Sequence, residues 1–253
     1  MHYQFAKERL NYSDLASGRV FYSLPGHPAF PVRLADEILQ RCLARREANH
    51  MSGPCVLYDP CCGAAYHLSV LAYLHWHSFN KVLGSDIDEK AVSAAKQNLG
   101  LLSIEGLDKR ISEISEMFRL YGKESHKEAL DSAHRLRNSI STLTEEHPLK
   151  TRIFRASALD SGALRENLKG ITVDIVFVDV PYGLHSQWRD PDTSSQLDNP
   201  LWRMLNALAG VLVPTSIVAV VSDKRQKASH EGYQRIEQFQ IGKRRVMLLK
   251  PTP

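Results

Sequence analysis

The stretch that decides the fold is VLYDPCCGAA, residues 56–65. Val56 to Asp59 is a short apolar run that ends in an acidic residue, and it predicts a buried strand. The following turn has glycine near its apex, which lets a ligand approach the backbone closely, and it opens into a helix expected to begin at Ala65. The free N–H groups at the start of such a helix suit a carboxylate or a phosphate. The stretch therefore predicts a ligand-binding strand–turn–helix unit.

The same alternation of strand and helix continues along the chain. The other expected strands are 81–85, 153–156, 173–178 and 216–221, and the expected helices are 32–46, 65–77, 88–101, 163–168 and 201–212. Val173 to Val178 is almost continuously apolar, as is typical of a parallel strand buried on both faces. Residues 235–241 and 245–249 flank Gly242-Lys243 and predict an antiparallel hairpin. We therefore expect an α/β fold with a doubly wound, seven-stranded mixed sheet and helices on both faces.

Two segments lie outside this repeat. Residues 1–50 form an N-terminal extension that ends in a helix, and residues 103–150 contain two helical patterns separated by Gly122. A crossover rarely needs so much chain between helix and strand. We expect a helical hairpin inserted at the carboxyl edge of the sheet, where ligands of such sheets bind; a packing lid and a substrate contact are both open roles. No linker divides the chain, so one domain spanning 1–253 is expected.

Composition excludes several classes of protein. The chain has 253 residues, a net charge of +4, 43% hydrophobic residues and four cysteines. Its apolar runs fall far short of the ~20 residues that cross a bilayer, and no signal-peptide pattern begins the chain. Four cysteines with one adjacent pair do not make a disulfide framework, so a reducing cytoplasm is expected. No further Cys or His has a spacing that would complete a metal site at Cys61-Cys62, so no metal is expected.

Basic residues are concentrated near the C-terminus. Residues 222–253 carry eight basic and three acidic side chains, a balance that favours a polyanionic partner. A solvated face is an equally good explanation of the charge alone. The residues expected to meet the phosphates of such a partner are Arg9, Arg19, Lys224, Arg225 and Lys227.

A second carboxylate follows the next expected strand. Asp86 lies 23 residues after Gly63, at a place suited to accept both hydroxyls of a ribose. This role is shared by dinucleotide-binding and methyltransferase folds. The dinucleotide fingerprint needs three glycines and only Gly63 is present, which makes a nicotinamide or flavin cofactor a weak interpretation. Asp88 is explained as the N-cap of the following helix.

A third constellation follows the most apolar strand, at Asp179-Val180-Pro181-Tyr182-Gly183. This turn resembles that of methyltransferases which modify a planar nitrogen, and the resemblance implies that the Asp179 carboxylate and the Val180 carbonyl accept from an exocyclic amine and turn its lone pair toward a methyl donor. For a ring N–H, Asp179 would instead be a general base. Pro181 fixes the turn, and Tyr182 offers a ring face to a flipped base.

These motifs resemble class I S-adenosylmethionine-dependent methyltransferases. The turn at 59–63 is similar to their cofactor loop, and the turn at 179–182 is similar to the acid/amide-Pro-Pro-Tyr signature of enzymes that methylate a planar nitrogen. Ala65, Ser157 and Val180 depart from the usual pattern. The resemblance implies that Asp59 faces the methionine amino group and that Arg33 pairs with its carboxylate. The cofactor-binding set that it implies is Asp59, Cys61, Gly63, Asp86, Ile87, Ser157, Ala158 and Arg33.

Longer matches resemble one family, the AviRa-type ribosomal RNA methyltransferases that confer avilamycin resistance. The matching segments are 14–20, 28–35, 59–63, 85–86, 96–99, 181–183 and 241–244, together with the helical insertion. The resemblance implies methylation of a guanine nitrogen in 23S ribosomal RNA, with S-adenosylmethionine as cofactor. A protein-glutamine methyltransferase, a DNA adenine methyltransferase and an RNA-binding protein with a degenerate cofactor pocket stay open as alternatives, as does the oligomeric state.

Overall fold

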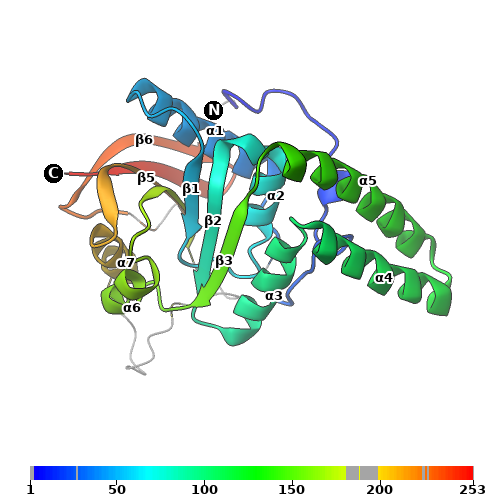
Figure 1. The fold of residues 1–253 in the computed structure, drawn as a ribbon. Coiled ribbons are helices and arrows are strands. Elements are labelled where there is room, and N and C mark those ends of the chain that lie inside the picture. Colours follow the sequence, from blue (N-terminus) through cyan, green and yellow to red (C-terminus); the bar gives the residue numbers. More distant parts are fainter. Residues whose placement is uncertain are drawn as a thin grey trace.

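The computed structural model describes residues 3–26, 28–180, 188, 199–223, 226 and 228–252. At its centre lies a sheet of seven strands in the order β3-β2-β1-β4-β5-β7-β6 (Figure 1). The strands are β1 (Cys55–Asp59), β2 (Phe79–Asp86), β3 (Lys150–Arg155), β4 (Val173–Asp179), β5 (Leu212–Asp223), β6 (Tyr233–Ile241) and β7 (Arg244–Pro251). β1 to β5 pair in parallel, and β7 runs antiparallel to both β5 and β6. The expected mixed sheet with a C-terminal hairpin is confirmed.

Helices cover both faces of the sheet. α1 (Val32–Ala48), α2 (Tyr66–Leu74) and α3 (Glu89–Gly100) pack on one face, and α6 (Ser161–Asn167) and α7 (Pro200–Ala209) pack on the other. Side chains alternate between the two faces along a strand. In β4, Ile175 and Phe177 join the core under α1 and α2, whereas Val176 and Val178 join the core under α6 and α7. None of the described helices is long and apolar enough to span a membrane.

Element ends differ from the expected ones in a few places. The helix expected over 65–77 stops at Leu74 and is followed by a 3₁₀ turn, η2 (Trp76–Ser78). Trp76 is buried there, and its indole N–H donates to the His147 carbonyl at 2.7 Å, which anchors the turn beside the C-terminal end of α5. Asp88 caps α3 as expected, since its Oδ1 accepts the N–H groups two and three residues on.

The insertion is the expected helical hairpin, formed by α4 (Ile104–Tyr121) and α5 (Glu124–Glu146). Its expected position at the carboxyl edge of the sheet is wrong. α3 carries the chain back from the carboxyl end of β2, and β3 starts at the amino edge because it is parallel to β2. The hairpin connects the end of α3 to the start of β3 and projects to the side of the sheet (Figure 1).

The N-terminal extension joins the hairpin to the sheet layers. Its short helix η1 (Ser13–Leu15) lies against α5, where Asp14 forms an ion pair with Arg135 at 2.6 Å. Further along, the Val20 carbonyl accepts from Arg110 of α4 at 2.8 Å. The extension therefore holds the insertion in a fixed place beside α3.

Candidate active site

The loop between β1 and α2, residues 60–65, lies at the carboxyl edge of the sheet and is fixed to the end of β2. The Cys62 N–H donates to the Ser85 carbonyl at 2.9 Å, and the Gly63 N–H donates to Asp86 Oδ2 at 2.9 Å. Gly63 has φ of 53°, in the left-handed region that favours glycine. Ala65 also has φ of 53° although it carries a side chain, and a glycine would adopt this conformation with less strain.

Gly84 of β2 lets this loop and β3 approach each other closely. A Cβ added there would lie 2.7 Å from Ile153 Cδ1 and 3.0 Å from Cys62 Sγ. The sequence offered no signal for this role beyond a glycine inside a strand, which marks a close backbone approach.

Asn98 of α3 ties the same loop to the N-terminal extension. Its buried side-chain amide donates to the Ala64 carbonyl at 2.8 Å and to the Tyr22 carbonyl at 3.0 Å, and its Oδ1 accepts the Tyr22 N–H at 2.8 Å. The loop is thereby held from both β2 and α3, and this rigidity favours a preorganised binding site.

Asp59 ends β1 and is fully buried behind the loop. Its Oδ1 accepts the Cys61 N–H at 2.8 Å. His67 Nε2 of α2 lies 3.0 Å from Asp59 Oδ2, in an alignment that does not make a hydrogen bond. The His67 ring packs on Phe30 and Phe177, at centroid distances of 5.8 and 5.0 Å. Sequence analysis missed His67; its only signal was a histidine in the first turn of the helix after the loop.

The ends of β2 and β3 bring the other cofactor candidates together. The Asp86 carbonyl accepts the Ala156 N–H at 3.1 Å, which places Ser157 and Ala158 beside Asp86 and Ile87. Ala158 is buried, whereas the other three are partly accessible. The four residues expected around ribose and adenine therefore lie on two neighbouring strand ends.

Asp179 ends β4 and pairs in register with Val221 of β5. The Val180 N–H donates to the Val221 carbonyl at 3.0 Å, and the Val180 side chain is buried in the core. Only the backbone of Val180 is thus available for the role predicted for it. The other two residues of the expected catalytic turn, Pro181 and Tyr182, lie outside the described residues.

The ends of β1, β2 and β4 converge around Cys61. Burial raises the pKa of the Cys61 thiol well above its usual value, and the nearby carboxylates of Asp59, Asp86 and Asp179 raise that pKa further. The three acids come from β1, β2 and β4, so the structure gathers them around one loop. This is a concentration of negative charge at the carboxyl edge, where ligands of such sheets bind.

Comparison with known proteins agrees with this geometry. Residues 1–244 match the protein family described as rRNA methyltransferase AviRa. The chain belongs to the AviRa family of rRNA methyltransferases.

A relative from Streptomyces viridochromogenes, named 23S rRNA (guanine(2535)-N(1))-methyltransferase, is 40% identical over 248 residues, covering 98% of this chain and 95% of the relative. The solved structure of the rRNA methyltransferase aviRa from the same organism matches with a TM-score of 0.86 and 38% identity, covering 99% and 96% of the two chains. A class I S-adenosylmethionine-dependent methyltransferase from Listeria monocytogenes matches with a TM-score of 0.54 at 12% identity, covering 94% and 65%, and shows the fold alone.

This AviRa-family chain is therefore an rRNA methyltransferase with a class I fold. Membership of this family favours rRNA over the two other substrates that the sequence left open, a protein glutamine and a DNA adenine. It also decides against a mere RNA-binding protein. The fold and activity implied by the motif at 59–63 are confirmed.

The residues expected to bind RNA are placed unevenly. Arg9 is exposed, and Arg19 is partly exposed and paired with Glu128 of α5 at 2.9 Å. The remaining three, Lys224, Arg225 and Lys227, lie outside the described residues. A phosphate contact by any of these five residues stays a prediction.

Arg33 is engaged elsewhere than at the strand ends. Its Nε donates to the Ala6 carbonyl at 2.8 Å, a terminal nitrogen donates to the Lys7 carbonyl at 2.7 Å, and its guanidinium lies 4.0 Å from the Tyr3 ring centroid. In this structure Arg33 fastens the N-terminal segment to α1. Its expected pairing with the cofactor carboxylate stays a prediction.

The donor set at the strand ends fits S-adenosylmethionine, which carries a positive sulfonium and a positive ammonium group. Three carboxylates supply the negative potential that such a cation needs. Asp86, one of these three, lies on a strand end and accepts the Gly63 N–H of the neighbouring loop. Within the described ranges, no group of three or more His, Cys, Asp and Glu side chains is arranged to hold a metal ion.

Proposed function

We propose that this chain transfers a methyl group from S-adenosylmethionine to N1 of a guanine in 23S ribosomal RNA. The convergence of Asp59, Asp86 and Asp179 around the β1–α2 loop supports the proposal most strongly. The name of the Streptomyces viridochromogenes relative supports the guanine N1 target, because the two chains match over nearly their full lengths. We further propose that residues 1–253 work as one catalytic unit, since the extension is bonded to the insertion through Arg110 and is tied to the loop through Asn98 of α3.

In this proposal the ends of β1, β2 and β3 hold the cofactor. Asp86 accepts the ribose hydroxyls, and Ile87, Ser157 and Ala158 border the adenine. Cys61 and Gly63 form the backbone floor under the methionine end. The resemblance implied that Asp59 faces the methionine amino group; because Asp59 is enclosed, we propose instead that it holds the Cys61 N–H and adds negative potential.

Asp179 handles the guanine. The bound cofactor supplies a methyl group activated by its positively charged sulfur. Guanine N1 carries a proton that must leave before its lone pair can attack. The Asp179 carboxylate takes up this proton as a general base, a role that contributes about 10²- to 10⁴-fold in rate. The Val180 carbonyl accepts from the neighbouring exocyclic amine and orients the ring, and Tyr182 is expected to stack on the flipped base.

Methyl transfer from radiolabelled cofactor to purified 23S rRNA tests the proposal. We expect incorporation together with a new reverse-transcription stop, because an N1 methyl blocks the pairing edge of guanine. Asp179→Asn keeps the size of the side chain but removes the base, and it should lower kcat by about 10²- to 10⁴-fold. Asp131→Asn, the same charge change on the exposed surface of α5, is the control.

Three results would each count against a different part of this proposal. Absence of any label in 23S rRNA would overturn the function. Labelling of the RNA without a stop at a guanine would overturn the N1 assignment only. Full activity of Asp179→Asn would remove the general base from the mechanism.

A further inference from the structure

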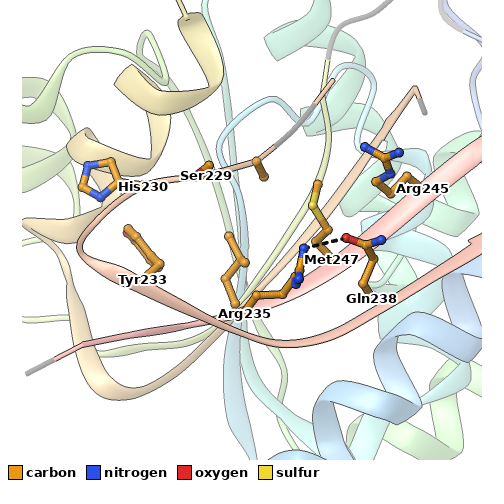
Figure 2. Close-up of a pocket in the computed structure, with 9 residues that line it drawn as sticks. Ser229, His230, Tyr233, Arg235, Gln238, Arg245 and Met247 are labelled. Atoms are coloured by element: carbon orange, nitrogen blue, oxygen red, sulfur yellow. Dashed lines mark hydrogen bonds between the residues drawn. The ribbon is translucent and has the colours of Figure 1, made fainter. Parts of the chain in front are cut away.

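A cavity of about 540 Å³ lies on the β6–β7 hairpin, on the face of the sheet that carries α7 (Figure 2). Its size is in the range of ligand-binding cavities and is sufficient for a nucleotide. Met247 and Leu249 contribute apolar surface to it. The polar residues that line it are Ser229, His230, Tyr233, Arg235, Gln238 and Arg245.

The charge of this cavity suits an anion. Two arginines line it, and none of the described lining residues is acidic. Arg235 donates to Gln238 Oε1 at 3.0 Å, and Arg245 donates to the Gln226 carbonyl at 3.1 Å. A guanidinium has five N–H donors, so these bonds orient each arginine and leave donors for a ligand. Figure 2 shows both side chains on the wall formed by the two strands.

His230 adds a buried donor that no described residue satisfies. Its Nδ1 accepts the Gly232 N–H at 2.9 Å, so the proton of the neutral ring is assigned to Nε2. Nε2 is buried and has no hydrogen-bond partner among the described residues. The ring is fixed by stacking on Trp202 at a centroid distance of 4.7 Å and by the edge of Tyr233 at 5.4 Å. A buried donor left without a partner costs free energy, and a ligand acceptor would recover it.

The cavity lies close to the catalytic strand end. Arg245 pairs in register with Ser222 of β5, and the preceding residue, Val221, pairs with Asp179 of β4. Neighbouring strands are ~4.8 Å apart, so the Arg245 backbone is about 10 Å across the sheet from that of Asp179. That span brings the Arg245 end of the cavity within reach of a nucleotide next to a base held at Asp179.

We propose that this cavity binds a nucleotide of the ribosomal RNA that flanks the target guanine, with its phosphate on Arg235 and Arg245 and an acceptor on His230 Nε2. The assignment rests on the proposed rRNA substrate. It adds a contact on the β6–β7 hairpin that positions the RNA backbone while the ends of β1 to β4 carry the chemistry. Phosphate contacts of this kind position a nucleic acid without reading its sequence.

Binding of a 23S rRNA fragment, measured by fluorescence anisotropy over a range of salt concentrations, tests the proposal. Arg235→Gln and Arg245→Gln should each raise the Kd at least fivefold and reduce the salt slope by about 0.7 to 0.9 per lost phosphate contact. Arg235 is exposed, and among the described residues its side chain bonds only to Gln238, so Arg235→Gln should fold normally. This variant keeps the test decisive even if Arg245→Gln, which loses the bond to the Gln226 carbonyl, disturbs the fold. Arg152→Gln, an exposed arginine on β3 at the opposite edge of the sheet, is the matched control.

Kinetics separate this contact from the chemistry. In the two variants the KM for RNA should rise more than kcat falls, and the Kd for S-adenosylmethionine should stay within twofold of the parent value. An unchanged Kd and salt slope for RNA in both variants would overturn the cavity proposal, while methyl transfer by the parent would leave the proposed function intact. If the parent transfers no methyl group but the variants still weaken RNA binding, the function fails and the cavity stands.

Discussion

Asp86→Asn is a sharp test of how the strand ends hold the cofactor. One oxygen of this carboxylate accepts the Gly63 N–H at 2.9 Å and the other accepts the Asp88 N–H at 2.9 Å, so the group is fixed before any ligand arrives. Asparagine keeps one oxygen and puts an amide donor in place of the other. It therefore loses one charge-assisted hydrogen bond to a ribose hydroxyl, which is worth about 1.5–3 kcal/mol. At 1.4 kcal/mol per tenfold, the Kd for S-adenosylmethionine should rise about 10- to 150-fold.

Isothermal titration calorimetry measures this Kd directly. Asp88→Asn is the matched control, because it removes the same charge only two residues from Asp86. Asp88 caps α3, and asparagine is an equally good N-cap, so the helix should be unaffected. Thermal unfolding of both variants checks that the fold is retained. Equal cofactor affinity in a folded Asp86→Asn variant and in the parent would refute the assignment of Asp86 to the ribose.

Three further predictions concern stability and reactivity around the site. Gly84→Ala should destabilise the protein by about 1–3 kcal/mol in urea unfolding, because its Cβ would overlap Ile153, whereas Gly100→Ala, which has open space, should not; equal midpoints would contradict this packing. The Arg135 guanidinium lowers the pKa of Asp14 to about 2, so the stability from this pair is present above the ordinary pKa near 3.9 and is lost as pH falls through about 2. The difference in urea midpoint between parent and Asp14→Asn should thus shrink from pH 5 to pH 2, and a constant difference would refute the pairing. Burial and nearby carboxylates raise the pKa of both thiols in Cys61-Cys62, so a thiol reagent at pH 8 should label native protein far more slowly than unfolded protein, and equal rates would show that the loop is open.

The strands and the site acids were predictable because both depend on local sequence. The apolar run that forms β4 needs no partner to be recognised, and an acid that ends a parallel strand must lie at the carboxyl edge of the sheet. Asp59, Asp86 and Asp179 therefore came together as the order of the strands required. The N-cap role of Asp88 was equally local.

Contacts between distant segments were not predictable in the same way. The burial of His67 beside Asp59 depends on Phe30 and Phe177, which approach from the extension and from β4. The insertion was placed at the wrong edge because helical periodicity gives the length of a hairpin and not the direction in which it leaves the sheet. Arg33 contacts the carbonyls of an irregular N-terminal segment, for which no sequence pattern exists.

The cavity on the β6–β7 hairpin shows the same limit. Arg235 and Arg245 are ten residues apart in the sequence and belonged to a generally basic tail. They line one cavity because a register shift between Arg235 and Glu237 sets which residues of β6 share a face with β7. Such an irregularity is decided by pairing between the strands and leaves no mark in either strand alone.

The most direct test of the proposed cofactor site at the strand ends is a crystal structure with S-adenosylhomocysteine, the product that remains after S-adenosylmethionine gives up its methyl group. We expect the ribose hydroxyls on the Asp86 carboxylate, the adenine between Ile87 and Ala158, and the sulfur over the β1–α2 loop on the side of Asp179. Density for the ligand away from these strand ends, or a ribose that does not touch Asp86, would contradict the proposed site.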